Sequence, residues 1–340
     1  MKPVYIVSWL FALAVSFVSC DDWLDKTPKD RLYPDVYFKT EDELRLFTNQ
    51  FYNNLVPSAV DIYSESSDLI VKSDLMLEMS GQRIIPDEGN GWNFTALRDI
   101  NFYLQYSHNC TEVNARNRYD GVARFFRAYF YFEKVKRYGD IPWYDKALDS
   151  DDPELYKARD SREFVMQKML EDLDFAIANL PKTKNAYVLT RWTALALKSR
   201  VCLFEGTFRK YHGLEDCEKY LNACVSASET FMNESGYTLY KSGSTPYRDL
   251  FASINLQADE VIFGRDYEAS LSVLHNVQNY ENSTTMGRPG MNKKIVNSYL
   301  MADGSRFTDK AGYETMTFDQ ECQNRDPRLA QTIRTPGYTR

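Results

Sequence analysis

The sequence predicts a mainly α-helical fold of stacked helical hairpins, followed by a loop-rich segment. Two observations support this prediction. Between residues 40 and 233 apolar side chains recur at intervals of three and four positions, which gathers them on one face of a helix. After residue 234 Gly, Ser, Thr and Asn become frequent, and only short strand-like pieces such as residues 260–267 remain.

Several expected helices have a recognisable start. Thr40 and Glu43 have the spacing of a capping box, in which two side chains accept the first free backbone N–H groups of a helix. Asp160 and Thr190 are expected as N-cap residues for the same reason. The predicted helices cover residues 40–57, about 92–108, 118–138, 160–179, 190–205 and 215–233, with one more near 291–300.

The expected helix ends are marked by glycine and proline. Proline cannot continue a helix, and glycine adopts the left-handed conformation that often ends one. The residues in these positions are Pro57, Gly139, Pro142, Pro181 and Gly206. The segment 139–160 then forms a connection of about 20 residues, and a loop of that length is usually functional or packed as its own unit.

Helices that follow one another are expected to form two antiparallel pairs, 118–138 with 161–180 and 190–205 with 215–233. Helical hairpins of this size resemble tetratricopeptide-like repeats, although the repeat consensus is not visible. We expect these hairpins and the loop-rich segment after them to belong to one domain over residues 40–340.

Composition and motifs argue against several functions. The net charge of −7 disfavours nucleic acid as a partner, because phosphate binding needs clustered Lys and Arg. The three His are scattered, and the common hydrolase and nucleotide-binding motifs are absent from the sequence. The carboxylates Glu171, Asp172 and Asp174 are interpreted as the solvated face of an amphipathic helix, and the five Cys after Cys20 as small buried apolar groups. We therefore predict no catalytic residue, no metal site and no cofactor.

The first 19 residues are expected to be a lipoprotein signal peptide. Lys2 supplies the positive charge, residues 4–19 carry none, and the small Ser19 precedes Cys20. Cleavage there would leave Cys20 as an acylated N-terminus that anchors the chain in lipid, with residues 20–39 as a polar tether. The alternative is an ordinary cleaved secretory signal in which Cys20 is incidental.

Five segments, taken together, resemble the SusD/RagB family of outer-membrane nutrient-uptake lipoproteins. The start at Cys20 also resembles that of the mature family members, and the order and spacing of the segments match. The segments are RFFRAYFYFEKVKRYGDIPWY (124–144), SREFVMQKMLEDLDFAIANLP (161–181), TRWTALALKSRVCLFEGTF (190–208), YRDLFASINLQADEVIFGRDY (247–267), and VNSYLMADGSRF (296–307) with RDPRL (325–329).

The resemblance implies a protein that binds oligosaccharide, or another nutrient, and delivers it to a SusC-like TonB-dependent barrel transporter. It implies a non-enzymatic receptor at the outer membrane that faces the cell exterior. Family members usually continue past RDPRL, so the C-terminal part of the helical domain is expected to be missing here. Two alternatives stay open, a surface glycoside hydrolase and a helical-repeat scaffold that binds only proteins.

Candidate ligand residues follow from the chemistry of sugars, whose C–H faces pack on aromatic rings while amides bond to their hydroxyl groups. Aromatic residues make up 14% of the chain, and most of them are expected in the core. The candidates are Trp92, Asn93, Asn90, Tyr63 and Tyr280, all on polar or Gly/Asn-rich segments. The alternative for Trp92 is that it anchors the start of its helix in the core.

Overall fold

The computed structural model describes residues 36–57, 69–71, 77–85, 89, 91–275 and 290–339. The predicted signal peptide, Cys20 and the candidates Tyr63, Asn90 and Tyr280 lie outside these residues. The described chain is mainly helical, as predicted. Its longer helices are α3 (Glu41–Leu55), α5 (Thr95–Tyr106), α6 (Val113–Tyr138), α7 (Arg162–Asn179), α8 (Arg191–Tyr211) and α9 (Cys217–Glu234).

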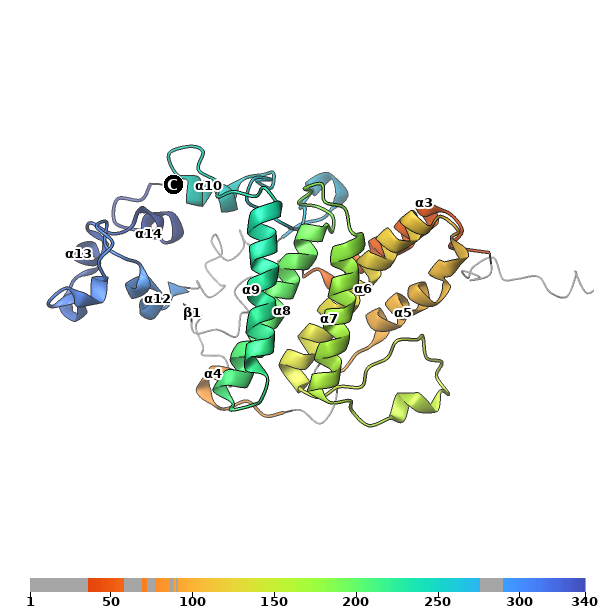
Figure 1. The fold of residues 1–340 in the computed structure, drawn as a ribbon. Coiled ribbons are helices and arrows are strands. Elements are labelled where there is room, and N and C mark those ends of the chain that lie inside the picture. The colour runs from red at the N-terminus through yellow and green to blue at the C-terminus, as the bar shows by residue number, and fades with distance from the viewer. Residues whose placement is uncertain are drawn as a thin grey trace, which may run out of the picture.

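These helices form a row in which each contacts its neighbours (Figure 1). Helices α6 and α7 are antiparallel partners, as are α8 and α9, and α7 packs on α8 to join the two hairpins. Helices α3 and α5 pack against the other side of α6. The predicted hairpins are therefore confirmed, and α6 lies in the middle of the core with buried residues on most of its faces.

The core is rich in aromatic rings. Phe51 of α3, Tyr103 of α5 and Phe126 of α6 are almost fully buried, and Phe51 meets each of the other two edge to face at about 6 Å. Burying one such side chain stabilises the fold by roughly 1.5–3 kcal/mol, and edge-to-face contacts add to this. Most aromatic residues thus have the structural role expected for them.

Two of the three expected N-caps are confirmed, whereas α6 begins at Val113, earlier than the predicted start at about residue 118. Thr40 and Thr190 each form a capping box. Helix α7, however, is capped by Ser161, whose Oγ accepts the Phe164 N–H at 3.3 Å. The prediction of Asp160 as the cap was wrong because its carboxylate is used elsewhere, accepting the Trp143 N–H at 2.7 Å.

The prediction that Gly206 ends a helix was also wrong. Helix α8 continues to Tyr211, and Gly206 lies inside it where α9 approaches. A Cβ at Gly206 would lie 2.7 Å from Leu221 Cδ2, so glycine serves here to let two helices pack closely.

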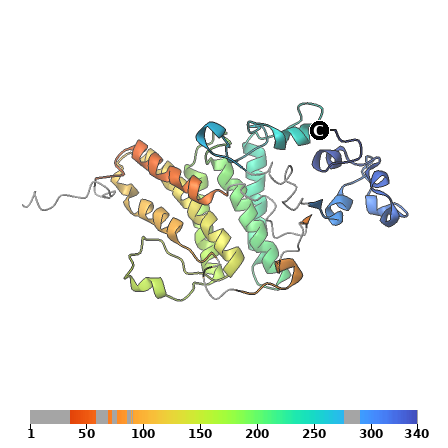
Figure 2. The ribbon, with the colours of Figure 1, turned by 180° about the vertical axis from the view of Figure 1, so that it is seen from behind.

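Short helices of the segment after residue 245 lie beyond the α9 end of the row (Figure 2), while residues 260–263 return to α3, α6 and α8. The short helices are α10 (Pro246–Ala252), α12 (Lys293–Ser298), α13 (Phe318–Cys322) and α14 (Pro327–Thr332), with single 3₁₀ turns between them. The strand-like residues 260–267 form no strand. The strands of the described chain are β1 (Ile70–Val71) and β2 (Gly290–Met291), which pair antiparallel.

The RDPRL segment organises this region. Arg325 is buried and donates to the carbonyl oxygens of Val296, Tyr299 and Glu321 at 2.7–2.8 Å. Arg328 pairs with Asp326, with its Nε donating to Asp326 Oδ1 at 3.0 Å.

The cysteines only partly match their expected role. The five described cysteines are free, and Cys110 and Cys202 are buried while Cys217, Cys224 and Cys322 are partly exposed. Burial raises the pKa of the Cys202 thiol to about 12.

Candidate ligand-binding groove

A groove of about 590 Å³ lies between the start of α5 and the 139–160 loop, which includes the 3₁₀ turn η2 (Pro153–Tyr156) and is at the lower right of Figure 1. We call it the Trp92 groove. Its lining includes Trp92, Phe94, Arg98, Asn101, Tyr144, Lys146, Leu148, Leu155, Lys157 and Arg159. Grooves of this size with an apolar wall and a few polar groups are typical of small-ligand sites.

Aromatic rings build one wall of the groove. Trp92 is 40% exposed and makes edge contacts with Phe94 at 5.3 Å and with Tyr138 at 4.9 Å between ring centroids. Phe94 in turn contacts Tyr144 at 5.8 Å. These contacts hold the Trp92 ring in one orientation while part of it faces solvent, which a stacking platform for a sugar requires.

A glycine turn positions Trp92. Gly89 and Gly91 have φ of +73° and +83°, a conformation that other residues rarely adopt. The turn is closed by the Trp92 N–H donating to Gly89 O at 3.0 Å, and the Asn93 N–H donating to Gly91 O at 2.9 Å. Lys134 of α6 also donates to Gly91 O. The turn is therefore attached to the helical body.

The opposite wall is fixed by buried polar groups. Asn101 of α5 donates to Tyr144 O at 2.8 Å and to Lys146 O at 3.3 Å. The Tyr131 hydroxyl of α6 accepts the Tyr144 N–H at 2.6 Å, and the Tyr131 ring stacks on Trp143 at 4.3 Å. These bonds hold the loop to the core, and the bond from Asn101 to Tyr144 joins residues more than 40 positions apart in the sequence.

Asn101 is oriented by a buried ion pair. Arg127 donates to Asn101 Oδ1 at 3.3 Å and makes two bonds to Asp172, at 2.7 and 2.8 Å. Burial opposes the Arg127 charge, but the bond to Asp172 raises the pKa of the guanidinium. The interpretation of Asp172 as a solvated carboxylate was wrong, because it faces α6 inside the bundle.

The groove is also lined by basic side chains. Arg98 Nε donates to Leu148 O at 3.2 Å, and Lys157 Nζ donates to Trp143 O at 2.6 Å. The hydrogen bond to Glu154 raises the pKa of Lys146, so this side chain stays charged at neutral pH. The Arg159 guanidinium lies 4.9 Å from the Trp92 ring centroid. These groups can donate hydrogen bonds to the hydroxyl or acidic groups of a bound sugar.

The structure does not bring Asn93 into the Trp92 groove. Asn93 lines a second hollow of about 590 Å³, together with Asp99, Glu133 and Lys134. Its side-chain oxygen already accepts the Thr95 N–H at 2.8 Å, which stabilises the start of α5. The two described candidates, Trp92 and Asn93, therefore face different hollows.

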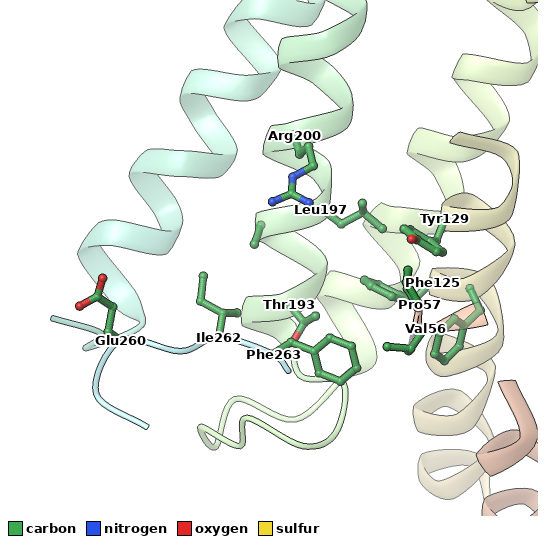
Figure 3. A pocket seen from close by; sticks show the side chains of 12 residues that line it. Val56, Pro57, Phe125, Tyr129, Thr193, Leu197, Arg200, Glu260, Ile262 and Phe263 are labelled. Carbon is green, nitrogen blue, oxygen red and sulfur yellow. The ribbon is translucent and has the colours of Figure 1, made fainter. Parts of the chain in front are cut away.

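A third hollow, of about 500 Å³, adjoins the second (Figure 3). It lies between the end of α3, helices α6 and α8, and residues 260–263. Its lining is mainly apolar, with Phe125, Leu197 and Phe263 among its residues, while Arg200 and Glu260 provide its charges. Sugar hydroxyl groups would find few partners there, which makes the Trp92 groove the better candidate.

The sequence prediction missed most residues of the Trp92 groove, including Phe94, Arg98, Tyr144, Lys157 and Arg159. The length of the 139–160 loop was a signal that it has a role, but not that it packs against α5. Among the described residues, no three His, Cys, Asp or Glu side chains are placed to share a metal ion. In the same part of the chain, no helix is long and apolar enough to cross a bilayer.

Two family models match the chain. Residues 79–191 match a model described as starch-binding and associating with the outer membrane, and residues 228–340 match the SusD family model. Among curated proteins, three SusD-like proteins from Formosa agariphila are similar. One is 26% identical over 80% of this chain and 55% of its own length. Another is 24% identical over 60% of this chain and 43% of its own length. The chain spans about half the length of these relatives.

Solved structures show the same fold. A SusD-like protein from Bacteroides fragilis superposes with a TM-score of 0.70 and 22% identity, over 90% of this chain and 62% of that one. A SusD-like carbohydrate binding protein from the same organism has a TM-score of 0.67 and 16% identity, over 86% of this chain and 59% of that one. From its two family models and these relatives, we conclude that the chain belongs to the SusD/RagB family.

Proposed function

We propose that the protein is an outer-membrane lipoprotein that binds oligosaccharide in the Trp92 groove and passes it to a TonB-dependent barrel transporter. The observation that carries the proposal is the groove itself, where a half-exposed, fixed Trp ring is surrounded by hydrogen-bond donors. Support comes from the matching family model, described as starch-binding, and from the carbohydrate-binding relative of the same fold.

The groove favours binding over hydrolysis. Glycoside hydrolysis needs two carboxyl groups facing the ligand, about 5–10 Å apart. The described residues that line the Trp92 groove include no Asp or Glu. The carboxylates of the adjoining loop that approach it, such as Glu154 and Asp160, are paired with Lys146 and Lys157. A bound sugar would therefore be held without being cleaved.

Calorimetric titration of a panel of oligosaccharides tests the binding. Replacing Trp92 with Ala should lower the affinity for the tightest-binding oligosaccharide about tenfold, since aromatic anchors typically contribute more than 1 kcal/mol to binding. Tyr211→Ala is the matched control, because Tyr211 is 82% exposed on α8 and lines none of the three hollows. Equal affinity of the Trp92→Ala variant and the native protein would reject this groove as the site.

Two further experiments test the location and the partner. Cys20→Ala should release the protein from the membrane fraction, and unchanged membrane retention would count against the lipid anchor. The native protein should co-purify with a barrel transporter from detergent-solubilised outer membranes. Release of shortened sugars by the purified protein would instead support the hydrolase alternative.

A further inference from the structure

The Trp92 groove carries a charge bias. Four basic side chains line it, Arg98 from α5 and Lys146, Lys157 and Arg159 from the 139–160 loop. The described lining residues include no carboxylate. A neutral oligosaccharide needs donors and acceptors in comparable numbers, whereas these four cations can only donate. The imbalance points to a ligand that brings its own negative charge.

Acidic residues of the loop pair with three of the four basic side chains, but none of these carboxylates lines the groove, and Arg159 is left without such a pair. Asp149 pairs with Arg98 at 3.7 Å, and Asp160 pairs with Lys157 at 3.0 Å. Lys146 pairs with both Glu154, at 2.9 Å, and Asp152, at 3.7 Å. Each of these carboxylates lies outside the lining. The Asp149 side chain is 84% exposed, and such surface pairs are worth little, so Arg98 remains available to a ligand.

Arg159 is the basic residue best placed to recognise an acidic group. Its guanidinium lies over the Trp92 ring, 4.9 Å from the ring centroid, so it stands directly beside the aromatic platform. Within the described part of the chain, no carboxylate lies at ion-pair distance from Arg159. The guanidinium presents a planar set of donors that matches a carboxylate or a sulfate with two parallel bonds.

From this juxtaposition we infer that the Trp92 groove selects acidic oligosaccharides. The sugar ring packs on Trp92, and its carboxylate or sulfate ester bonds to Arg159, with Arg98 and Lys157 close by. This inference rests on the proposed function, because it assumes that the groove is the sugar site. It adds the chemical class of the ligand, an anionic glycan.

Matched pairs of sugars test the inference and distinguish the two sources of charge. The probes are oligogalacturonate with its methyl ester, and a sulfated galactan oligosaccharide with its desulfated form. At about 20 mM salt at least one acidic member should bind roughly fivefold or more tightly than its neutral form, and the difference should shrink at about 500 mM salt, where charges are screened. The pair that shows the preference identifies a uronate or a sulfate ester as the recognised group.

Arg159→Gln should remove most of the preference, because it should weaken binding of the acidic form much more than binding of the neutral form. Arg159 is exposed, so circular dichroism of the variant should match that of the native protein. Arg200→Gln is the control, because Arg200 is an exposed arginine that lines the hollow of Figure 3 instead. It should keep the full preference.

The outcomes separate this inference from the proposed function. Equal binding of the acidic and neutral forms in both pairs, or a preference that survives Arg159→Gln, overturns the acidic-ligand inference alone. Binding of neutral glucans or xylans with no binding of either acidic probe also overturns it and leaves the proposed function standing. If no carbohydrate binds, both are rejected.

Discussion

Arg127 and Asp172 form a two-point ion pair between α6 and α7, with nitrogen–oxygen distances of 2.7 and 2.8 Å. Both side chains are more than nine-tenths buried. The pair joins two helices of the central hairpin, and through Asn101 it reaches the loop that forms one wall of the Trp92 groove. A single buried contact thus links the stability of the bundle to the shape of the groove.

Replacing Asp172 with Asn should destabilise the protein by about 3 kcal/mol, because it leaves the Arg127 charge buried without its counter-ion. The free energy of unfolding from urea titration measures the loss. Asp174→Asn is the matched control on the same helix. Asp174 is 58% exposed and pairs with Lys198, so its loss should cost less than about 1 kcal/mol. Equal effects of the two substitutions would contradict the role given to Asp172.

Removing the Asn101 side chain should loosen the groove. Asn101→Ala removes the closer of the two donors to the Tyr144 carbonyl and leaves only the Tyr131 hydroxyl at 3.5 Å, at a cost of about 1–3 kcal/mol. Hydrogen exchange should accelerate in residues 143–148, and sugar affinity should fall with it. Peptides from α9, at the other end of the helical row, should exchange as in the native protein. Unchanged exchange in the loop would show that Asn101 does not hold it.

Adding a methyl group at Gly206 should push α8 and α9 apart. The added Cβ would lie 2.7 Å from Leu221 Cδ2, and such overpacking typically costs about 1–3 kcal/mol. Leu221→Ala in the same chain should recover part of the loss, so the two changes should be non-additive in thermal unfolding. Gly121→Ala is the control, because its Cβ would meet Leu180 at an ordinary 3.4 Å. Additive effects of Gly206→Ala and Leu221→Ala would exclude the proposed contact.

Glu163 should make stability depend on acid pH. Burial opposes its charge, but the bonds from Lys219, Arg209 and Tyr220 lower its pKa overall. A lowered folded-state pKa stabilises the protein above the ordinary value of 4.5, and this contribution is lost as pH falls through the folded-state pKa. The Glu163→Gln variant should therefore be less stable than the native protein at pH 7. The difference between their free energies of unfolding should shrink and close as the pH falls below about 4.5.

Unfolding at several pH values measures this difference. Glu229→Gln, at an exposed carboxylate of α9, is the control and should show little difference at any pH. A stability gap for Glu163→Gln that stays constant down to pH 3 would mean that the charge of Glu163 is not involved.

The periodicity of apolar residues was sufficient to predict the helices and both hairpins, because it depends on local geometry and burial alone. The same holds for the capping boxes at Thr40 and Thr190, where donor and acceptor lie three residues apart. Helix ends were less predictable. Gly206 has the residue type of a helix end but is used for a close approach, and only the position of Leu221 distinguishes the two roles.

The sequence by itself determined the helical architecture, the family resemblance and the presence of Trp92 on a glycine-rich turn. The tertiary structure alone decided that Asp172 is buried, that Asn93 and Trp92 line different hollows, and that the 139–160 loop completes the groove. The physical reason is sequence distance. Contacts such as Asn101 to Tyr144 or Arg127 to Asp172 join residues more than 40 positions apart, and no local pattern encodes them.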